Sequence, residues 1–151
     1  MSKSDFDTLE SQFTCNGAPF ENRYTIMQSS DAAIAFFDFW EKETVDTQES
    51  FYVMILNNAN HIVNIKRIAL GTPTACIIST SLLLRTVLVE NGVAFICAHN
   101  HPSGKLRPSQ ADKDLTEKLK KAAKAVDLTI MDHVIISPSS QFFSFADEGY
   151  M

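Results

Sequence analysis

The apolar run from Val93 to Ala98 is the feature that most restricts how this chain can fold. Its six residues, VAFICA, include no charged or strongly polar side chain. A strand with one face in water alternates apolar and polar residues, whereas a continuous apolar run is typical of a strand covered on both faces. The run therefore predicts a central strand with other structure packed on each side.

Periodic patterns elsewhere in the chain predict the elements around this strand. In chain order they are a helix over 31–43, a hairpin with strands 50–57 and 61–71, a helix over 81–91, and, after the central strand, a helix over 109–126 and strands within 128–137 and 141–147. Serines 29 and 30 are expected to cap the first helix, and Gly92 to end the second. The order α-β-β-α-β-α-β, with a short final strand, predicts a three-layer α/β/α domain around a mixed β-sheet.

The length of 151 residues fits one compact domain. Residues 1–22 show no sustained period and are interpreted as an N-terminal tail or arm, with the domain over 23–151. No apolar run approaches the ~18 residues of a membrane span, and the first residues lack the apolar segment of a secretory signal. The three cysteines form no CxxC pair. We therefore expect a cytoplasmic protein with reduced thiols and no contact with a membrane.

The net charge of −5 weighs against general affinity for nucleic acid. The charge is uneven, because residues 1–50 hold ten acids and three bases whereas residues 105–124 hold seven bases and three acids. Basic side chains on a helix face are most often simply solvated. Nucleic acid is therefore a weakly supported partner.

His99 and His101 directly follow the central strand. At positions i and i+2 their side chains project to one face, with backbones about 6–7 Å apart, so both imidazoles can bind one ion. A catalytic Zn²⁺ takes three N or O ligands from the protein and keeps a fourth position open for water. Asp112, in the first turn of the next predicted helix, is the candidate third ligand.

Simpler interpretations of these residues remain open. A single histidine at a strand end is more often packed or exposed than metal-bound, and Asp112 together with Ser109 also fits a capping box. Cys97 lies about 13 Å from His101 along an extended strand, so those two cannot share an ion. A zinc deaminase is excluded because the chain lacks both H-x-E and P-C-x-x-C. The pair of histidines facing an acidic helix start favours a metal site over the simpler interpretations.

The residues around this pair carry a family resemblance. HNHPSG at 99–104 and PSQAD at 108–112 resemble the H-x-H-P-x(6)-S-x(2)-D pattern of JAMM metalloproteases in the JAB1/MPN superfamily. The further segments DLTEKL, MDHVIIS and FSFADEG are similar to the RadC-type branch, whose members are often labelled DNA repair proteins. The resemblance runs from about Arg23 to the C-terminus and implies a JAB1/MPN-like fold.

The resemblance also implies roles for individual residues. His99, His101 and Asp112 correspond to the zinc ligands, and Ser109 to a residue that hydrogen-bonds the site or the developing oxyanion. Glu49, just before the strand at 50–57, corresponds to the upstream glutamate that acts as general acid/base.

Two further expectations concern the rest of the chain. His133, in an Asp-His pair that recurs in the family, is expected to be a buried histidine bonded to its neighbours and not a fourth ligand. Full-length RadC-type proteins carry an N-terminal helix-hairpin-helix region, for which residues 1–22 are too short. We therefore expect a catalytic domain alone.

The leading functional hypothesis is a zinc-dependent hydrolase that cleaves a peptide or isopeptide bond in a peptide or protein substrate. The alternative is a DNA-associated module, as the RadC label suggests, and a third candidate is a metal-stabilised scaffold without turnover. Loops 57–60, 71–79 and 103–108 are expected to select the substrate. Neither the substrate nor the oligomeric state follows from the sequence.

Overall fold

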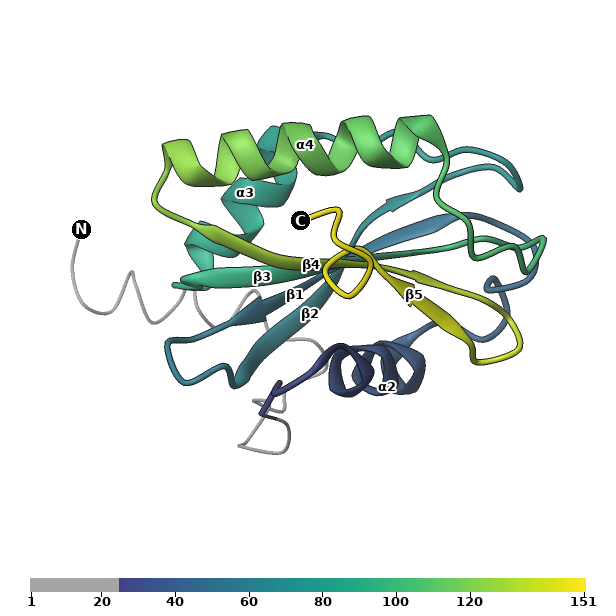
Figure 1. Cartoon of the computed structure of the whole chain (residues 1–151), viewed down its shortest axis with the longest axis horizontal. Coiled ribbons are helices and arrows are strands. Elements are labelled where there is room, and N and C mark those ends of the chain that lie inside the picture. Colours follow the sequence, from purple (N-terminus) through teal and green to yellow (C-terminus); the bar gives the residue numbers. More distant parts are fainter. Residues whose placement is uncertain (1–24) are drawn as a thin grey trace.

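The computed structural model describes residues 25–151, so the predicted tail at 1–22 lies outside the described residues. A mixed sheet separates helix α2 on one face from helices α3 and α4 on the other (Figure 1). The elements are α2 (Ser29–Phe39), β1 (Ser50–Leu56), β2 (Ile62–Leu70), α3 (Thr80–Val89), β3 (Ala94–Asn100), α4 (Gln110–Ala125), β4 (Thr129–Ile136) and β5 (Phe142–Ser144). The predicted three-layer α/β architecture is confirmed.

Strand β3 lies at the centre of the five-stranded sheet, whose order is β2-β1-β3-β4-β5. It pairs antiparallel with β1 and parallel with β4, and α4 forms the crossover between the two parallel strands. Every residue of β3 is buried, as the apolar run predicts. The alternation of the strand sends Phe95 and Cys97 to the core under α3 and α4, and Ile96 and Ala98 to the core against α2.

The ends of the helices α2 and α3 differ from the sequence expectation. Helix α2 is capped not by serine but by a capping box, in which the carboxylate of Asp31 accepts the backbone N–H of Gln28. At the end of α3, Asn91 and not Gly92 takes the left-handed conformation, with φ at 55°. Gly92 is needed for a different reason, because a Cβ at this position would collide with side-chain atoms of Ile55 and Val87.

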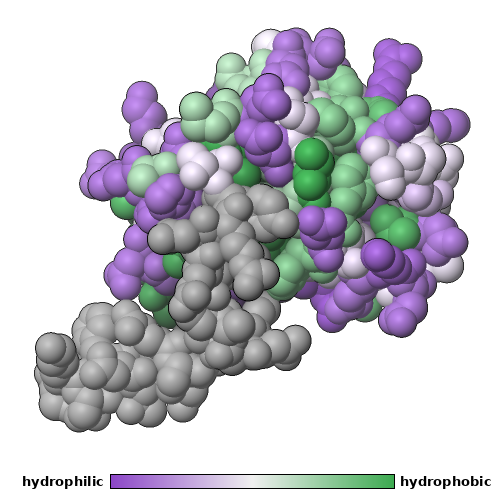
Figure 2. Space-filling view, turned by 90° about the horizontal axis from the view of Figure 1, so that it is seen from below, coloured by the Kyte–Doolittle hydropathy of each residue, from purple (hydrophilic) through white to green (hydrophobic). Residues whose placement is uncertain are grey.

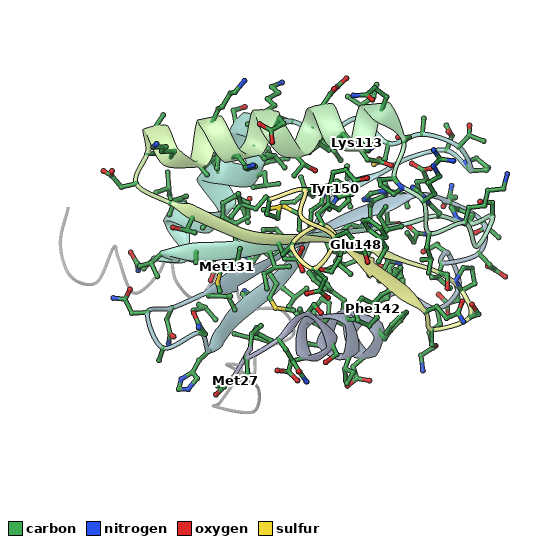
Figure 3. All side chains as sticks on the ribbon, in the orientation of Figure 1. Met27, Lys113, Met131, Phe142, Glu148 and Tyr150 are labelled. Carbon is green, nitrogen blue, oxygen red and sulfur yellow. The ribbon has the colours of Figure 1, made fainter. Side chains whose placement is uncertain are left out.

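Helix α4 presents Thr116, Leu119 and Ala123 to the core as its buried face. Leu115, Ala122 and Val126 continue the apolar periodicity of Leu119 in the sequence, but they are half-buried or exposed, so the buried face is rotated from that stripe toward Thr116. The C-terminal segment follows the edge strand β5 and passes beneath this helix (Figure 3), where Lys113 Nζ lies 4.7 Å from the centre of the Tyr150 ring.

The surface on the α2 side mixes hydrophilic and hydrophobic residues (Figure 2). Met27 and Ile34 are among the large hydrophobic side chains exposed to solvent. None of the helices within residues 25–151 is long and apolar enough to cross a membrane.

Candidate metal centre

The side chains of His99, His101 and Asp112 meet above the C-terminal end of β3. Strand β3 and the residue after it supply the two histidines, and the first turn of α4 supplies the carboxylate. Within residues 25–151 this is the one group of three or more His, Cys, Asp or Glu residues whose ligand atoms all lie within 4.8 Å of one another. The structure therefore brings together the three ligands predicted from the sequence.

The spacing of these ligand atoms suits a tetrahedral metal ion. His99 Nε2 lies 3.0 Å from His101 Nε2 and 3.2 Å from Asp112 Oδ1, and His101 Nε2 lies 3.5 Å from Asp112 Oδ2. Ligands at the usual Zn–N and Zn–O distances of about 2.0–2.2 Å, arranged tetrahedrally, are separated by about 3.3–3.6 Å. Only small movements would bring all three onto one zinc ion.

Hydrogen bonding fixes which nitrogen of His101 faces the cluster. Its Nδ1 lies 2.6 Å from the carbonyl oxygen of Lys105, and because a carbonyl can only accept, Nδ1 is the donor. In the neutral ring, Nε2 then carries a lone pair aimed at His99 and Asp112. Burial alone would lower the pKa of His101, but the hydrogen bonds to Asp112 and to the Lys105 carbonyl raise it overall. The cluster thus attracts positive charge.

Asp112, the candidate third ligand, also takes the capping role considered from the sequence. Ser109 is the N-cap of α4: its hydroxyl accepts the N–H of Asp112 at 3.1 Å, and its own N–H donates to Asp112 Oδ2 at 2.7 Å. Burial by itself raises the pKa of Asp112, but the His101 and His99 rings beside it, when protonated on Nε2, and the N–H of Ser109 favour the charged carboxylate and hold the pKa well below the usual range. The carboxylate is therefore ionised and fixed in orientation, as a metal ligand requires.

Glu49 borders the same cleft as His101, Ser109 and Asp112. It is held through its backbone, which donates to the carbonyl of Thr72 at 2.9 Å just before β1 begins. Burial raises the pKa of Glu49 against the opposing influence of the two ligand histidines. A half-buried carboxylate with a raised pKa accepts a proton more readily than an ordinary one, which favours a role in proton transfer.

Asn100, between the two candidate ligand histidines, is a site residue that the sequence reasoning missed. Its side chain is fully buried and points away from the ligands, toward the loop before β1. The amide oxygen accepts the N–H of Ser50 at 2.7 Å, and the amide nitrogen donates to the carbonyls of Val45 at 2.7 Å and Gln48 at 2.8 Å. Asn100 therefore anchors the segment that carries Glu49 to the strand that carries the ligands.

His133 lies directly behind His99 and is completely buried. Its ring stacks on Phe145 with centroids 4.7 Å apart and meets the edge of Phe51 at 5.5 Å. Its Nε2 lies 2.8 Å from His99 Nδ1, and its Nδ1 lies 2.7 Å from the hydroxyl of Thr116. Burial lowers the pKa of His133 well below the usual range, so the ring is neutral. The expectation of a buried, bonded histidine is confirmed.

The cleft beside the ligands has a volume of about 400 Å³. Residues 73–76 and 102–107 form part of its walls, so two of the three loops expected to select substrate border the site. Residues 57–60 do not border it, because they form the distant turn of the β1–β2 hairpin. Cys76 also lines the cleft, but burial raises the pKa of its thiol, which disfavours the thiolate that a cysteine hydrolase needs.

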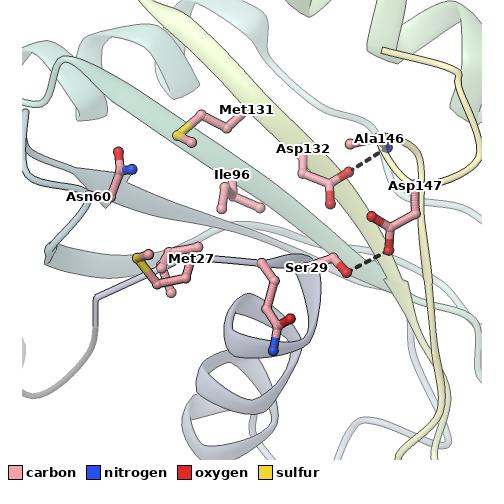
Figure 4. Close-up of a pocket in the computed structure, with 10 residues that line it drawn as sticks. Met27, Ser29, Asn60, Ile96, Met131, Asp132, Ala146 and Asp147 are labelled. Atoms are coloured by element: carbon pink, nitrogen blue, oxygen red, sulfur yellow. Dashed lines mark hydrogen bonds between the residues drawn. The ribbon is translucent and has the colours of Figure 1, made fainter.

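A second cavity, of about 230 Å³, lies on the α2 side of the sheet (Figure 4). Met27 and Met131 line it together with Asp132 and Asp147. Both carboxylates are engaged: Asp132 accepts the N–H of Ala146 at 2.9 Å, and Asp147 accepts the hydroxyl of Ser29 at 2.6 Å. None of the residues that line this cavity belongs to the candidate metal site formed by His99, His101 and Asp112, which lies on the α4 side of the sheet.

A family model described as the RadC-like JAB domain matches residues 27–150. A UPF0758 protein of Flavobacterium johnsoniae is 40% identical over 101 residues, which cover 67% of this chain and 44% of the relative. A UPF0758 protein of Vibrio cholerae is 40% identical over 103 residues, covering 68% and 64% respectively. One from Pelodictyon phaeoclathratiforme is 35% identical over 106 residues, covering 70% and 47%. The matched part thus spans less than two thirds of each of these relatives.

Proposed function

Since the chain belongs to the RadC-like JAB domain family, within the JAB/MPN superfamily, we propose that it is a zinc-dependent hydrolase that cleaves an amide bond. The bond is a peptide or isopeptide bond in a peptide or protein substrate. The observation that carries the proposal is the convergence of two imidazole nitrogens and a carboxylate within 3.5 Å of one another at the edge of an open cleft.

Three electron-rich atoms at these distances repel one another unless a proton or a cation lies between them. Two imidazoles and one carboxylate are typical ligands of a catalytic zinc, and three protein ligands leave one position open. His99, His101 and Asp112 would hold the ion. When bound, zinc supplies a Lewis acid that polarises the amide carbonyl and lowers the pKa of water to about 7.

Glu49 is the residue proposed to move the proton. It takes a proton from the attacking water as the new C–O bond forms, and passes it to the amine nitrogen as the C–N bond breaks. Burial raises the pKa of Glu49 from the ordinary value of a carboxyl group toward neutral pH, and a smaller gap between pKa and pH makes both transfers more efficient.

Ser109 is proposed to stabilise the oxyanion. Its hydroxyl oxygen accepts from the N–H of Asp112, which leaves the hydroxyl proton to be donated into the cleft that both residues line. A donor placed where negative charge develops stabilises the transition state more than the ground state.

The first test combines metal content with hydrolysis. The purified wild type is expected to hold about one zinc per chain by mass spectrometry, His101→Ala to lose it, and Glu49→Gln to keep it. Glu43→Gln serves as the matched control, because Glu43 is an exposed acid in the same loop.

Hydrolysis is then assayed with a peptide and isopeptide library in ¹⁸O-labelled water. We expect new carboxyl ends that carry ¹⁸O with the wild type and with Glu43→Gln, and none with Glu49→Gln. A wild type that holds no zinc even after zinc is supplied, or cleavage that survives in both Glu49→Gln and His101→Ala, would overturn the proposal.

A role on nucleic acid is the second candidate, and one observation favours it. Lys105 and Arg107 line the cleft, where they place positive charge beside the metal cluster. The acidic net charge of the chain opposes it. An acidic peptide would satisfy the same two side chains, so we rank the hydrolase first.

A further inference from the structure

A buried chain of hydrogen bonds runs from His99 back to helix α4. His99 Nδ1 lies 2.8 Å from His133 Nε2, and His133 Nδ1 lies 2.7 Å from Thr116 Oγ1. The Thr116 hydroxyl in turn donates to the backbone carbonyl of Asp112 at 2.8 Å. Because Asp112 is also the third candidate ligand, this series of hydrogen bonds starts and ends at the candidate metal site.

The carbonyl at the end of this chain fixes the direction of every bond in it. A carbonyl oxygen can only accept a hydrogen bond, so the Thr116 hydroxyl donates its one proton to the backbone carbonyl of Asp112. Thr116 Oγ1 must then accept from His133 Nδ1–H. In a neutral ring this leaves a lone pair on His133 Nε2, which can only accept from Nδ1–H of His99.

The surroundings of the His133 ring favour its neutral form. His133 is fully buried, with its ring against Phe51 and Phe145, and the partners of its two ring nitrogens are His99 and Thr116, neither of them a carboxylate. Desolvation in such surroundings strongly disfavours an imidazolium. With Nδ1 of His99 protonated, its Nε2 carries the lone pair and faces His101 and Asp112.

We propose that His133 and Thr116 are positioning residues that lock His99 in the tautomer able to bind a metal through Nε2. The proposal rests on the metal site of the proposed function, but not on hydrolysis itself. It also explains why His133 is not a fourth ligand, since its Nε2 already accepts from His99.

The lock has two physical consequences. A neutral imidazole in water favours the proton on Nε2, so a relay that protonates Nδ1 reverses the intrinsic preference of His99 before any ion arrives. In addition, the partner of His99 is an uncharged ring, whereas many ligand histidines donate to a carboxylate. A neutral partner leaves the positive charge of a bound ion less compensated, which favours acidification of water.

The tautomer is measured directly by NMR on metal-free protein, from the ¹⁵N shifts of the His99 ring above the ordinary pKa of histidine. We expect Nδ1–H in the wild type. In Thr116→Val, His133 loses its acceptor, turns its proton toward His99 and drives that ring to Nε2–H. Thr86→Val is the matched control, because Thr86 makes the same hydroxyl bond to the carbonyl four residues earlier, on α3, and it should leave His99 unchanged.

Zinc affinity, measured by competition with a chelator, is the second readout. Loss of the partner of a ligand histidine typically weakens metal binding about 10–100-fold, and we expect this range for Thr116→Val and for His133→Phe, which keeps an aromatic ring between its neighbours. His133→Gln restores an acceptor and a donor, and it should recover the Nδ1–H form of His99 and part of the affinity.

The outcomes separate this proposal from the hydrolase proposal. An Nε2–H tautomer of His99 in the wild type overturns the lock, as does a tautomer in Thr116→Val that matches the wild type. Zinc affinity in Thr116→Val within twofold of the wild type also overturns it. A protein that shows the lock and binds zinc, yet cleaves no amide, would sink the hydrolase and leave the lock standing.

Discussion

Asn100 offers the sharpest test of how the fold places Glu49 beside the candidate metal ligands. Its side chain makes three hydrogen bonds, to the N–H of Ser50 and to the carbonyls of Val45 and Gln48. Asn100→Ala removes all three, whereas the isosteric Asn100→Asp keeps an acceptor for Ser50 and turns a carboxylate oxygen toward the two carbonyls. The pair of variants separates the strand anchor from the loop anchor.

The magnitude follows from the burial of each partner. Ser50 is fully buried, so its stranded N–H in Asn100→Ala costs about 1–3 kcal/mol. The two carbonyls lie on a partly exposed loop and can turn to water, so each loses only about 0.5–1.5 kcal/mol. The expected destabilisation of about 2–6 kcal/mol lowers the melting temperature by at least about 4 °C in a domain of this size.

In addition to stability, the assay measures hydrogen exchange in the loop before β1 and the rate of hydrolysis. Hydrogen exchange over residues 44–49 should accelerate in both variants, and hydrolysis per zinc-loaded molecule should fall while zinc content is kept. Asn57→Ala is the control, because Asn57 organises the β1–β2 turn with the same chemistry, through the N–H groups of Ala59 and His61. That variant should lose stability without losing hydrolysis.

Two results would refute this reasoning. Asn100→Ala within about 0.5 kcal/mol of the wild type would show that the three bonds contribute little to the fold. Unchanged exchange and unchanged hydrolysis in Asn100→Asp would show that the Glu49 segment does not depend on Asn100 for its position.

The remaining predictions concern pH, packing, metal and nucleic acid. Because burial raises the pKa of Glu49 above 4.5 and only the deprotonated form accepts a proton, kcat/KM should fall with decreasing pH on a limb above pH 4.5, and a limb at or below that value contradicts the assignment. Gly92→Ala should destabilise the domain by about 1–3 kcal/mol in urea denaturation, since the added methyl meets Ile55 and Val87, and an unchanged midpoint would contradict the packing. Zinc at 100-fold over its Kd should raise the free energy of unfolding by about 2.7 kcal/mol, and a chelator should reverse this; no shift would argue against a site formed only in the folded state. Duplex DNA should not bind at moderate salt, given the net charge of −5, and tight binding that weakens steeply with salt would instead support the nucleic-acid candidate.

The layers of the fold were predictable because apolar periodicity records burial. The unbroken run 93–98 identified the central strand, and its neighbours followed from period and turn chemistry. The buried face of α4 differs from the apolar stripe in its sequence, because the periodicity rule counts apolar residues only. Thr116 is buried, yet its hydroxyl has partners in both His133 and the Asp112 carbonyl, and a pattern of hydrophobicity cannot register a polar group that is satisfied.

The same limit explains which site residues could be found from the sequence. His99 and His101 are readable because a strand fixes the geometry of i and i+2, and Asp112 because a helix start fixes its own first turn. Glu49 is far away in sequence and looks like any other loop acid, so only the family resemblance singled it out. Its position depends on tertiary hydrogen bonds, which no local pattern encodes.

The tripeptide 99–101 shows how one strand end can position both the candidate metal ligands and the segment that carries Glu49. Alternation sends His99 and His101 to the α4 side of the sheet, where Asp112 completes the cluster, and sends Asn100 to the opposite side, where the Glu49 segment passes. The backbone of the tripeptide stays in register through its pairing with β4, including the bond from His101 N–H to the Ile136 carbonyl. A register shift of one residue would exchange these faces, so that the ligands would point at the loop and the amide at α4. The identity of the middle residue is therefore tied to the geometry of the other two, because the strand that aims the ligands also aims the anchor of the proposed general base.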